Sequence, residues 1–186
     1  SVRDNGGTTN GGVDTDASPN TLTIDVTSVN DAPSGTNTTV TTNEDTVYSF
    51  AAANFGFTDP NDSPANTLSA VRIDTLPVLG TLSIAAGASV PAGPVTLGQV
   101  ISAADIAFLR YTPVANGNGA AYATFTFSVR DNGGTANGGV DTDTSPNTLT
   151  IDVTAVDDAP VLTVNAGLTA NEGGTRVITT SNLSVS

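Results

Sequence analysis

The residues best suited to chemistry in this chain are its carboxylates, which gather in short polar stretches instead of forming one solvated face. Each stretch combines Asp or Glu with Asn, Pro or Thr, and the stretches are Asn30-Asp31, Asn43-Glu44-Asp45, Asp59-Pro60-Asn61-Asp62, Asp131-Asn132, Asp141-Thr142-Asp143 and Asp157-Asp158. Two carboxylates about 4 Å apart repel by roughly 1 kcal/mol in water and by several times that near a protein surface. The chain has 18 acidic residues against five arginines and no lysine, so a hard cation is the simplest way to neutralise them. Ca²⁺ takes six to eight oxygen ligands from flexible loops, so the Asp-x-Asn-Asp and Asp-x-Asp spacings predict calcium in preference to Mg²⁺.

The composition excludes several other kinds of chemistry. Because the chain has no Cys, it can form neither a disulfide framework nor a thiolate metal site. Because it also has no His and no Lys, it lacks the parts of a Ser-His-Asp triad, a Schiff base and a phosphate-binding P-loop. Paired carboxylates can hydrolyse glycosides, but Trp, which usually lines sugar clefts, is absent and the acids lie in repeated motifs. We therefore do not expect an enzyme.

Two classes of partner are also not expected. Five scattered arginines are too few to neutralise a phosphate backbone, which argues against nucleic acid. No apolar run approaches the roughly 20 residues that cross a bilayer, which argues against membrane insertion. Abundant Thr and Val with frequent Gly and Pro favour short strands and turns, and we expect an all-β protein of the secreted or surface-exposed class.

A near-identical duplication organises the chain. Residues 1–33 and 128–160 differ at only four positions at an offset of 127 residues, and the differing pairs are Thr9/Ala136, Ala17/Thr144, Ser28/Ala155 and Asn30/Asp157. Self-similarity of this kind is typical of tandem repeats.

A weaker similarity extends the repeat in the C-terminal direction. Residues 40–58 align with 168–186, so that Asn43-Glu44 corresponds to Asn171-Glu172. We therefore expect three units: the C-terminal part of one repeat (1–33), a complete repeat (34–160), and the N-terminal part of a following repeat (161–186).

Alternating apolar and polar residues predict the strands of the complete repeat. Leu149, Ile151 and Val153 alternate with Thr and Asp, which is the period of a half-buried strand. Five segments are predicted as strands: 47–53, 68–74, 80–84, 122–129 and 148–154. Ser102 is a candidate cap for one short helix at 103–109 with Asp105 in its first turn. Strands at this spacing, with at most one short helix near 102–109, predict a sandwich of two sheets.

The same residues resemble a known family. The run FSVRDNGG…TLTIDVTAVDDAP (127–160) is similar to the closing third of a cadherin-type domain, and NED (43–45), FTDPND (57–62) and VNDAP (29–33) add to the similarity. The chain looks most like the cadherin-like repeats of giant bacterial adhesins that are exported by type I (RTX-type) secretion. Residues 171–186 also resemble the start of a chondroitin-sulphate-proteoglycan repeat. The resemblance implies an Ig-like antiparallel β-sandwich with Ca²⁺ held between consecutive domains.

The resemblance also implies the calcium ligands. At the first junction they are the linker residues Asn30 and Asp31, with Asp59, Asn61 or Asp62, and Asp131 from the following domain. At the second junction they are Glu44, Asp157 and Asp158, and Glu172 repeats the Glu44 position in the third unit. The linkers depart from the family pattern at Ser28 or Ala155 and at Ala32 or Ala159, which predicts one or two ions per linker.

Simpler explanations of these motifs stay open. Residues 59–62 are also typical of an Asx/Pro turn. The Asn-Gly pairs between 131 and 143 predict tight turns that need no ion, so Asp141 and Asp143 are equally well explained as turn residues. The Phe and Tyr side chains are expected in the core or on strand faces.

The expected function is structural: a calcium-rigidified stalk or extender repeat of a large secreted cell-surface adhesin or extracellular filament. Its expected partners are neighbouring repeats of the same polypeptide. Two alternatives are a ligand-binding adhesion module for a glycan or a cell surface, and a subunit that assembles with its own kind through uncovered strand edges. The low aromatic content, with three Tyr and no Trp, favours the spacer.

Overall fold

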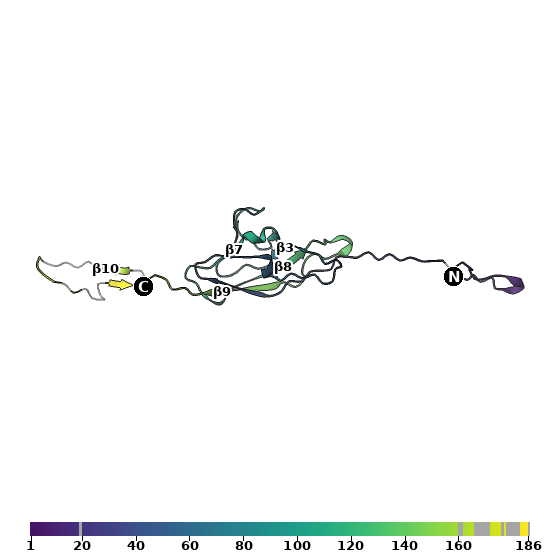
Figure 1. Cartoon of the computed structure of the whole chain (residues 1–186), viewed down its shortest axis with the longest axis horizontal. Coiled ribbons are helices and arrows are strands. Elements are labelled where there is room, and N and C mark those ends of the chain that lie inside the picture. The colour runs from purple at the N-terminus through teal and green to yellow at the C-terminus, as the bar shows by residue number, and fades with distance from the viewer. Residues whose placement is uncertain (19, 160–161, 166–171, 176, 178–182, 186) are drawn as a thin grey trace.

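Two β-sheets pack face to face in the computed structural model, which describes the chain except for residues 19, 160–161, 166–171, 176, 178–182 and 186 (Figure 1). The five-stranded sheet has the order β1-β9-β8-β3-β6 and the four-stranded sheet has the order β2-β7-β4-β5. A separate pair, β10 and β11, lies beyond the sandwich on the C-terminal side. The all-β sandwich expected from the sequence is confirmed.

The strands are short except for β8. The five-stranded sheet contains β1 (Thr38–Asn43), β3 (Leu68–Ile73), β6 (Val100–Ser102), β8 (Gly119–Asp131) and β9 (Asn147–Thr154). The four-stranded sheet contains β2 (Tyr48–Ser49), β4 (Thr81–Ile84), β5 (Gly93–Pro94) and β7 (Leu109–Thr112). The C-terminal pair consists of β10 (Leu162–Asn165) and β11 (Leu183–Val185).

Among the described strands all pairings are antiparallel except one. β1 runs parallel to β9 with Val40 opposite Ile151, whereas β8 pairs antiparallel with both β9 and β3. β9 therefore lies between β1 and β8, and its inward side chains Leu149, Ile151 and Val153 are at most 3% exposed. The first strand of the repeat, β1, and its last strand, β9, are in this way held side by side.

The core follows from the alternation seen in the sequence. Phe125 and Phe127 of β8 point to the same face and are buried. Their rings meet Phe50 and Phe55 edge to face, with centroid distances of 5.8 Å for Phe50–Phe125 and 4.9 Å for Phe55–Phe127. Such aromatic pairs add to the stability gained from burial alone.

Helical structure is limited to four 3-10 turns among the described residues: η1 (Thr9–Gly11), η2 (Ala52–Phe55), η3 (Ile106–Phe108) and η4 (Ala136–Gly138). The short helix expected near 102–109 is present only as η3. The residue before η3 is Asp105, not Ser102; the Ser102 hydroxyl instead pairs with Asp105, accepting from its amide (3.2 Å) and donating to its Oδ2 (2.8 Å).

The expected strand at 47–53 is shorter than the pattern indicated. Only Tyr48 and Ser49 pair, with β7. Asn54 then accepts a hydrogen bond from the Ala51 amide through Oδ1 (2.8 Å), and its own amide donates to the Ala51 carbonyl (2.9 Å). This side-chain turn chemistry starts η2 and ends the strand.

The first copy of the duplicated segment shows how much of the structure depends on the rest of the repeat. Residues 20–27 have the same sequence as β9, yet they pair with no other strand in the described structure. Leu22, Ile24 and Val26 are 85%, 74% and 88% exposed. Their counterparts in β9 are buried, so a strand of this sequence needs partners like β1 and β8.

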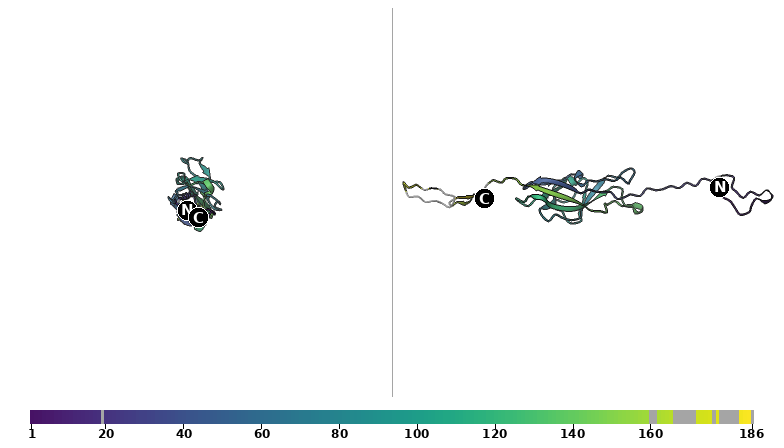
Figure 2. Two further views of the ribbon diagram at one scale, coloured as in Figure 1. Left: turned by 90° about the vertical axis from the view of Figure 1, so that its right-hand side faces the viewer. Right: turned by 90° about the horizontal axis from the view of Figure 1, so that it is seen from below.

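The two linkers leave the sandwich at opposite ends of its long direction (Figure 2). Residues 20–33 extend from one end toward the N-terminal hairpin, and residues 155–159 leave from the other end. In the part of the chain that the structure describes, no helix has the length and apolar character needed to cross a membrane.

The duplicated strand offers a matched test of this fold. Replacing Ile151 with Ala should lower the free energy of unfolding by about 2–5 kcal/mol, because it opens a cavity in the core. The same change at Ile24, which is 74% exposed, should alter it by no more than about 0.5 kcal/mol. Urea unfolding of both variants measures the difference. Equal losses would show that residues 20–27 are packed in solution.

Candidate functional site

A hairpin loop (131–143), which begins at the last residue of β8 and leads toward β9, forms one end of the sandwich. Asp131 ends β8, and its Oδ1 accepts a hydrogen bond from the Gly133 amide (2.8 Å). The loop is closed by the Asp131 amide donating to the Asp141 carbonyl (3.0 Å) and by an ion pair between Arg130 and Asp141 (2.5 Å). This pair lowers the pKa of the Asp141 carboxyl below its ordinary value.

The first copy of the loop forms the same hairpin without a sandwich around it. The Asp4 amide donates to the Asp14 carbonyl (2.9 Å), the Gly6 amide donates to Asp4 Oδ1 (2.9 Å), and Arg3 pairs with Asp14. Each contact repeats one in the second copy at the offset of 127 residues. The loop conformation is therefore encoded locally, by Asx turns and Asn-Gly turns.

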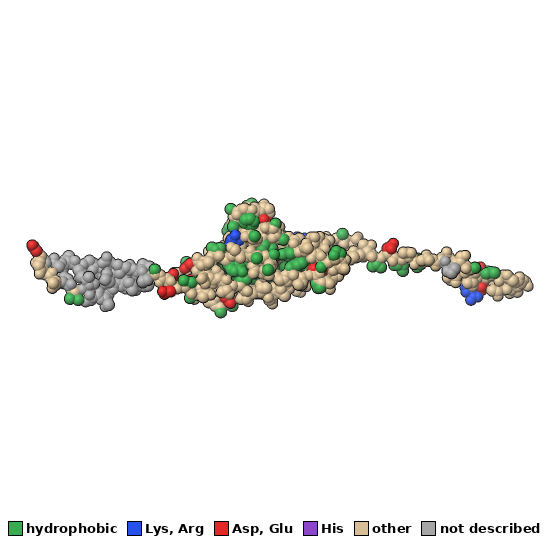
Figure 3. All heavy atoms as spheres, viewed as in Figure 1, with side chains coloured by type: hydrophobic (Ala, Val, Ile, Leu, Met, Phe, Trp, Pro, Cys, Tyr) green, Lys and Arg blue, Asp and Glu red, His purple; other side chains and the backbone are tan. Residues whose placement is uncertain are grey.

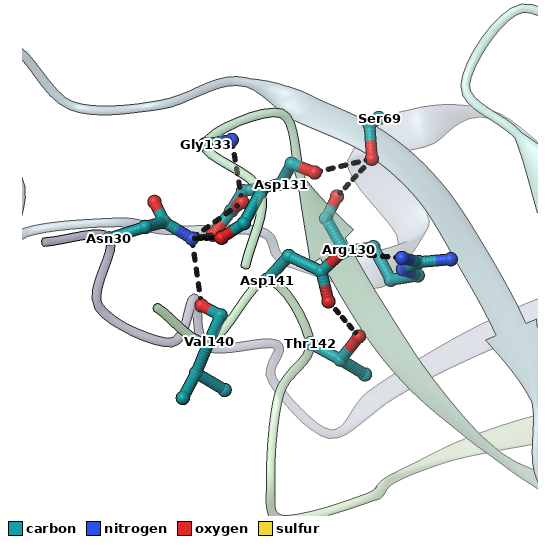
Figure 4. Close-up of polar contacts among 9 residues, drawn as sticks. Asn30, Ser69, Arg130, Asp131, Gly133, Val140, Asp141 and Thr142 are labelled. Carbon is teal, nitrogen blue, oxygen red and sulfur yellow. Dashed lines mark hydrogen bonds and ion pairs between the residues drawn. The ribbon is translucent and has the colours of Figure 1, made fainter. Parts of the chain in front are cut away.

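The second copy of the loop (131–143) is hydrogen-bonded to the linker that precedes the sandwich. The side-chain nitrogen of Asn30, Nδ2, donates to Asp131 Oδ1 and Oδ2 (3.1 and 3.3 Å). It also donates to the Gly134 carbonyl (3.1 Å) and to the Val140 carbonyl (2.8 Å) (Figure 4). The Val140 amide in turn donates to the Asn30 carbonyl (2.9 Å). We call these contacts the Asn30 site. It joins residues that are about a hundred positions apart in the chain.

Asn66 and Asp59 complete this end of the sandwich. Asn66 Nδ2 donates to Asn30 Oδ1 (2.5 Å), and the Asn66 amide donates to Asp59 Oδ2 (2.6 Å). Asp59 is only 6% exposed, and its other oxygen, Oδ1, has no hydrogen-bond partner among the described residues. A buried carboxylate oxygen without a partner is costly, so Asp59 is the least satisfied acceptor of the site.

The remaining residues predicted for the first junction lie close by with different exposure. The Asp31 amide donates to Asp62 Oδ2 (3.0 Å), which brings the linker to the 59–62 turn. Asp31 and Asn61 have exposed side chains, whereas Asp62 is half-buried. Asp143 is buried for a structural reason, since its carboxylate accepts from the Gly35 and Ser145 amides (2.8 and 2.9 Å).

A second cluster lies at the opposite end, around Glu44. Glu44 is 6% exposed, its Oε1 accepts from the Val156 amide (2.6 Å) and its Oε2 accepts from Asn118 Nδ2 (2.8 Å). These two hydrogen bonds, with that from the Val156 amide having the larger effect and that from Asn118 the smaller, hold the pKa of Glu44 below its ordinary value of 4.5. Glu44 therefore attaches the exit linker to the sandwich.

Asp45 and Asp158 lie next to this cluster. The Asn116 amide donates to Asp45 Oδ1 (3.0 Å). With its side-chain nitrogen facing the carboxylates, Asn116 also donates to Asp45 Oδ2 (3.2 Å) and Asp158 Oδ2 (2.9 Å). Acidic side chains gather on the surface where the chain leaves the sandwich toward β10 (Figure 3).

Two predicted ligands stand apart from these contacts. Asp157 is exposed beside the exit linker. Glu172 is exposed in a turn between β10 and β11, while the residues just before it, 166–171, lie outside the described structure. The alignment of the third unit with 40–58 falls largely on such residues.

The structure thus brings Asn30, Asp31, Asp59, Asp62 and Asp131 to one end and Glu44 and Asp158 to the other. Within the described residues, no three carboxylates converge closely enough to form a metal-binding group by themselves. A cation at either end would need amide or carbonyl oxygens as well, which Ca²⁺ accepts.

Sequence reasoning missed the residues that complete both clusters with amides instead of carboxylates: Asn66, Asn116, Asn118 and Gly133. Asn116 and Asn118 flank one glycine in the run NGN, which was available as a turn signal. Gly133 has a spatial role, because a Cβ there would lie 1.8 Å from Asn30 Oδ1 and 2.6 Å from Asn66 Nδ2.

Gly133 permits a matched test of the Asn30 site. Gly133→Ala should expel the Asn30 side chain and reduce stability by about 1–3 kcal/mol, since it removes hydrogen bonds to a carboxylate. Gly6→Ala makes the same change in the first copy, where the nearest atom would be Asp4 Oδ1 at 3.2 Å, and should cost far less. The NMR signals of the Asn30 side-chain amide should move to those of an exposed Asn only in Gly133→Ala. Unchanged signals in both variants would contradict this.

The lowered pKa of Glu44 predicts an acid-sensitive exit linker. Glu44 is easier to ionise in the folded chain, so its contribution to stability is complete above its ordinary pKa of 4.5 and is lost as the pH falls through the lower folded value. Exchange of the Val156 amide, measured by NMR, should therefore accelerate only below pH 4.5. Glu44→Gln should lack this pH step, and a step of the same size in the variant would contradict the assignment.

The comparisons add no named relative to this geometry. No family model, curated protein or solved structure matches the chain. The resemblance to cadherin-like repeats therefore stands on the sequence motifs alone.

Proposed function

We propose that the chain is a structural repeat of the stalk of a large secreted cell-surface adhesin or extracellular filament, in which Ca²⁺ stiffens the joints between repeats. The observation that carries this proposal is Asp59 Oδ1, a buried carboxylate oxygen without a partner beside the docked linker. An isolated buried acceptor of this kind is costly, and a bound cation would remove that cost.

The oxygen-rich surroundings fit such an ion. Asp59, Asp62 and Asp131 offer carboxylates, and Asn30 offers an amide oxygen once its side chain is turned over. These ligands belong to the linker and to separate loops of the sandwich. Calcium held by them would neutralise their charge and would cross-link the linker to the sandwich.

The positions of the linkers support a rod. The entry and exit linkers leave opposite ends of the sandwich, so repeats of this kind would follow one another end to end (Figure 2). The entry linker is attached to the sandwich by its own Asn30 side chain, and the exit linker is attached by the side chain of Glu44. Without a cation, carboxylates at a joint repel one another and favour bending wherever no hydrogen-bond donor lies between them.

The surface favours a spacer over a binding tip. Every Phe and Tyr of the chain is buried or half-buried, so none forms an exposed aromatic platform for a sugar. The alternative of a glycan-binding or cell-binding module therefore has less support. The exposed apolar face of residues 20–27 favours contact with another repeat, in the same chain or a second copy.

Calcium should stabilise the protein through the first junction. At a concentration a hundredfold above its Kd, one bound ion adds about 2.7 kcal/mol, so the melting temperature should rise by several degrees relative to EGTA. Asp59→Asn should reduce this rise. Asp25→Asn removes an exposed carboxylate of residues 20–27 and should leave it unchanged.

Calorimetry of the three proteins, with and without calcium, measures both effects. Identical melting curves of the unmodified chain in calcium and in EGTA would rule out the stiffening role. A calcium effect that Asp59→Asn leaves intact would place the ion elsewhere.

A further inference from the structure

The side chain of Asn30 lies in surroundings that suit a positive charge. Its amide nitrogen faces four oxygen atoms, two from the Asp131 carboxylate and one each from the Gly134 and Val140 carbonyls. Hydrogen-bond donors bound to a carboxylate make the stronger class of hydrogen bond. The positive end of the Asn30 side-chain amide dipole, its NH₂ group, thus lies where these four oxygen atoms converge.

The orientation of this amide is determined from both sides. Asn66 Nδ2 donates to Asn30 Oδ1 (2.5 Å), so the oxygen faces a donor while the nitrogen faces only acceptors. The missing Cβ of Gly133 makes room for this arrangement. The main chain of the linker is fixed at the same place by Val140 and Asp62.

We infer that Asn30 holds the entry linker against the sandwich without any metal, its amide nitrogen taking the part that a cation would otherwise play. This inference rests on the proposed function, because it assigns two states to one joint. In the metal-free state the nitrogen faces the loop. With calcium bound, the amide would instead turn over and offer its oxygen as a ligand.

The duplicated linker differs at this position. Asp157 corresponds to Asn30 at the offset of 127 residues, and a carboxylate has no hydrogen to donate. Against a loop like 131–143 it would meet a second carboxylate and two carbonyl oxygens. A linker of the sequence VDDAP can therefore close on such a loop only when a cation is present, whereas VNDAP closes with or without one. The repeats would then have joints of two kinds, permanently closed and calcium-dependent.

The variant Asn30→Asp converts the first linker into the second kind and tests this directly in the full chain. Two amide protons report on linker docking: Asp31, which donates to Asp62, and Val140, which donates to the Asn30 carbonyl. Their hydrogen exchange is followed by NMR in EGTA and in calcium. Asn5→Asp adds the same charge at an exposed bend in the first copy and serves as the control.

In EGTA the unmodified chain and Asn5→Asp should protect both amides. Asn30→Asp should lose about tenfold or more of that protection, and calcium should restore it. Full protection of Asn30→Asp in EGTA would overturn the inference, as would a lack of protection in the unmodified chain in EGTA. If calcium fails to restore protection in Asn30→Asp while the EGTA results are as expected, the metal-free role of Asn30 stands and the proposed calcium site at this joint fails.

Discussion

The structure depends on how a chain with many carboxylates and few cations satisfies its acceptors. The 18 acidic side chains face five arginines, so most cannot form ion pairs. They accept instead from main-chain amides: Asp131 from Gly133, Asp143 from Gly35 and Ser145, Asp59 from Asn66, Asp105 from Ser89, and Glu44 from Val156. Each such bond fixes a loop, and several fix a loop to a distant part of the chain. The carboxylates therefore organise the connections that the short strands leave loose.

Asparagine side chains satisfy further acceptors, because the side-chain amide donates hydrogen bonds and carries no charge. Asn30, Asn66 and Asn118 each donate a side-chain N–H to an acidic residue or to the amide oxygen beside one. At the entry linker most acceptors meet a donor, and among the buried side-chain acceptors of the described residues only Asp59 Oδ1 is left without a partner. Because hydrogen bonds leave this one oxygen unsatisfied, the joint would gain stability by binding a cation there.

The sequence predicts the fold well and the sites in part. Alternation in β8 and β9 predicted the buried faces, since Phe125, Phe127 and Ile151 are all buried there. It overestimated the strand at 47–53, because Asn54 hydrogen-bonds back to Ala51 and starts a 3-10 turn. The carboxylates at each end were predicted from repeated motifs. Their amide partners were not, because nothing local to Asn66 or Asn118 shows that it faces a linker far away in the chain. Ca²⁺ binding stays a prediction.

The two copies of one sequence separate what is encoded locally from what the repeat must supply. The hairpin of Asp4 and the hairpin of Asp131 have the same hydrogen bonds, although only the second belongs to a sandwich. The strand that follows is buried in one copy and exposed in the other, as Ile151 at 0% and Ile24 at 74% show. Turn chemistry acts over a few residues, whereas a half-apolar strand needs neighbours to cover it. The loop can therefore take shape before the sandwich closes, and Asn30 can enter it only once β8 and β3 have brought Asp131 and Asn66 together.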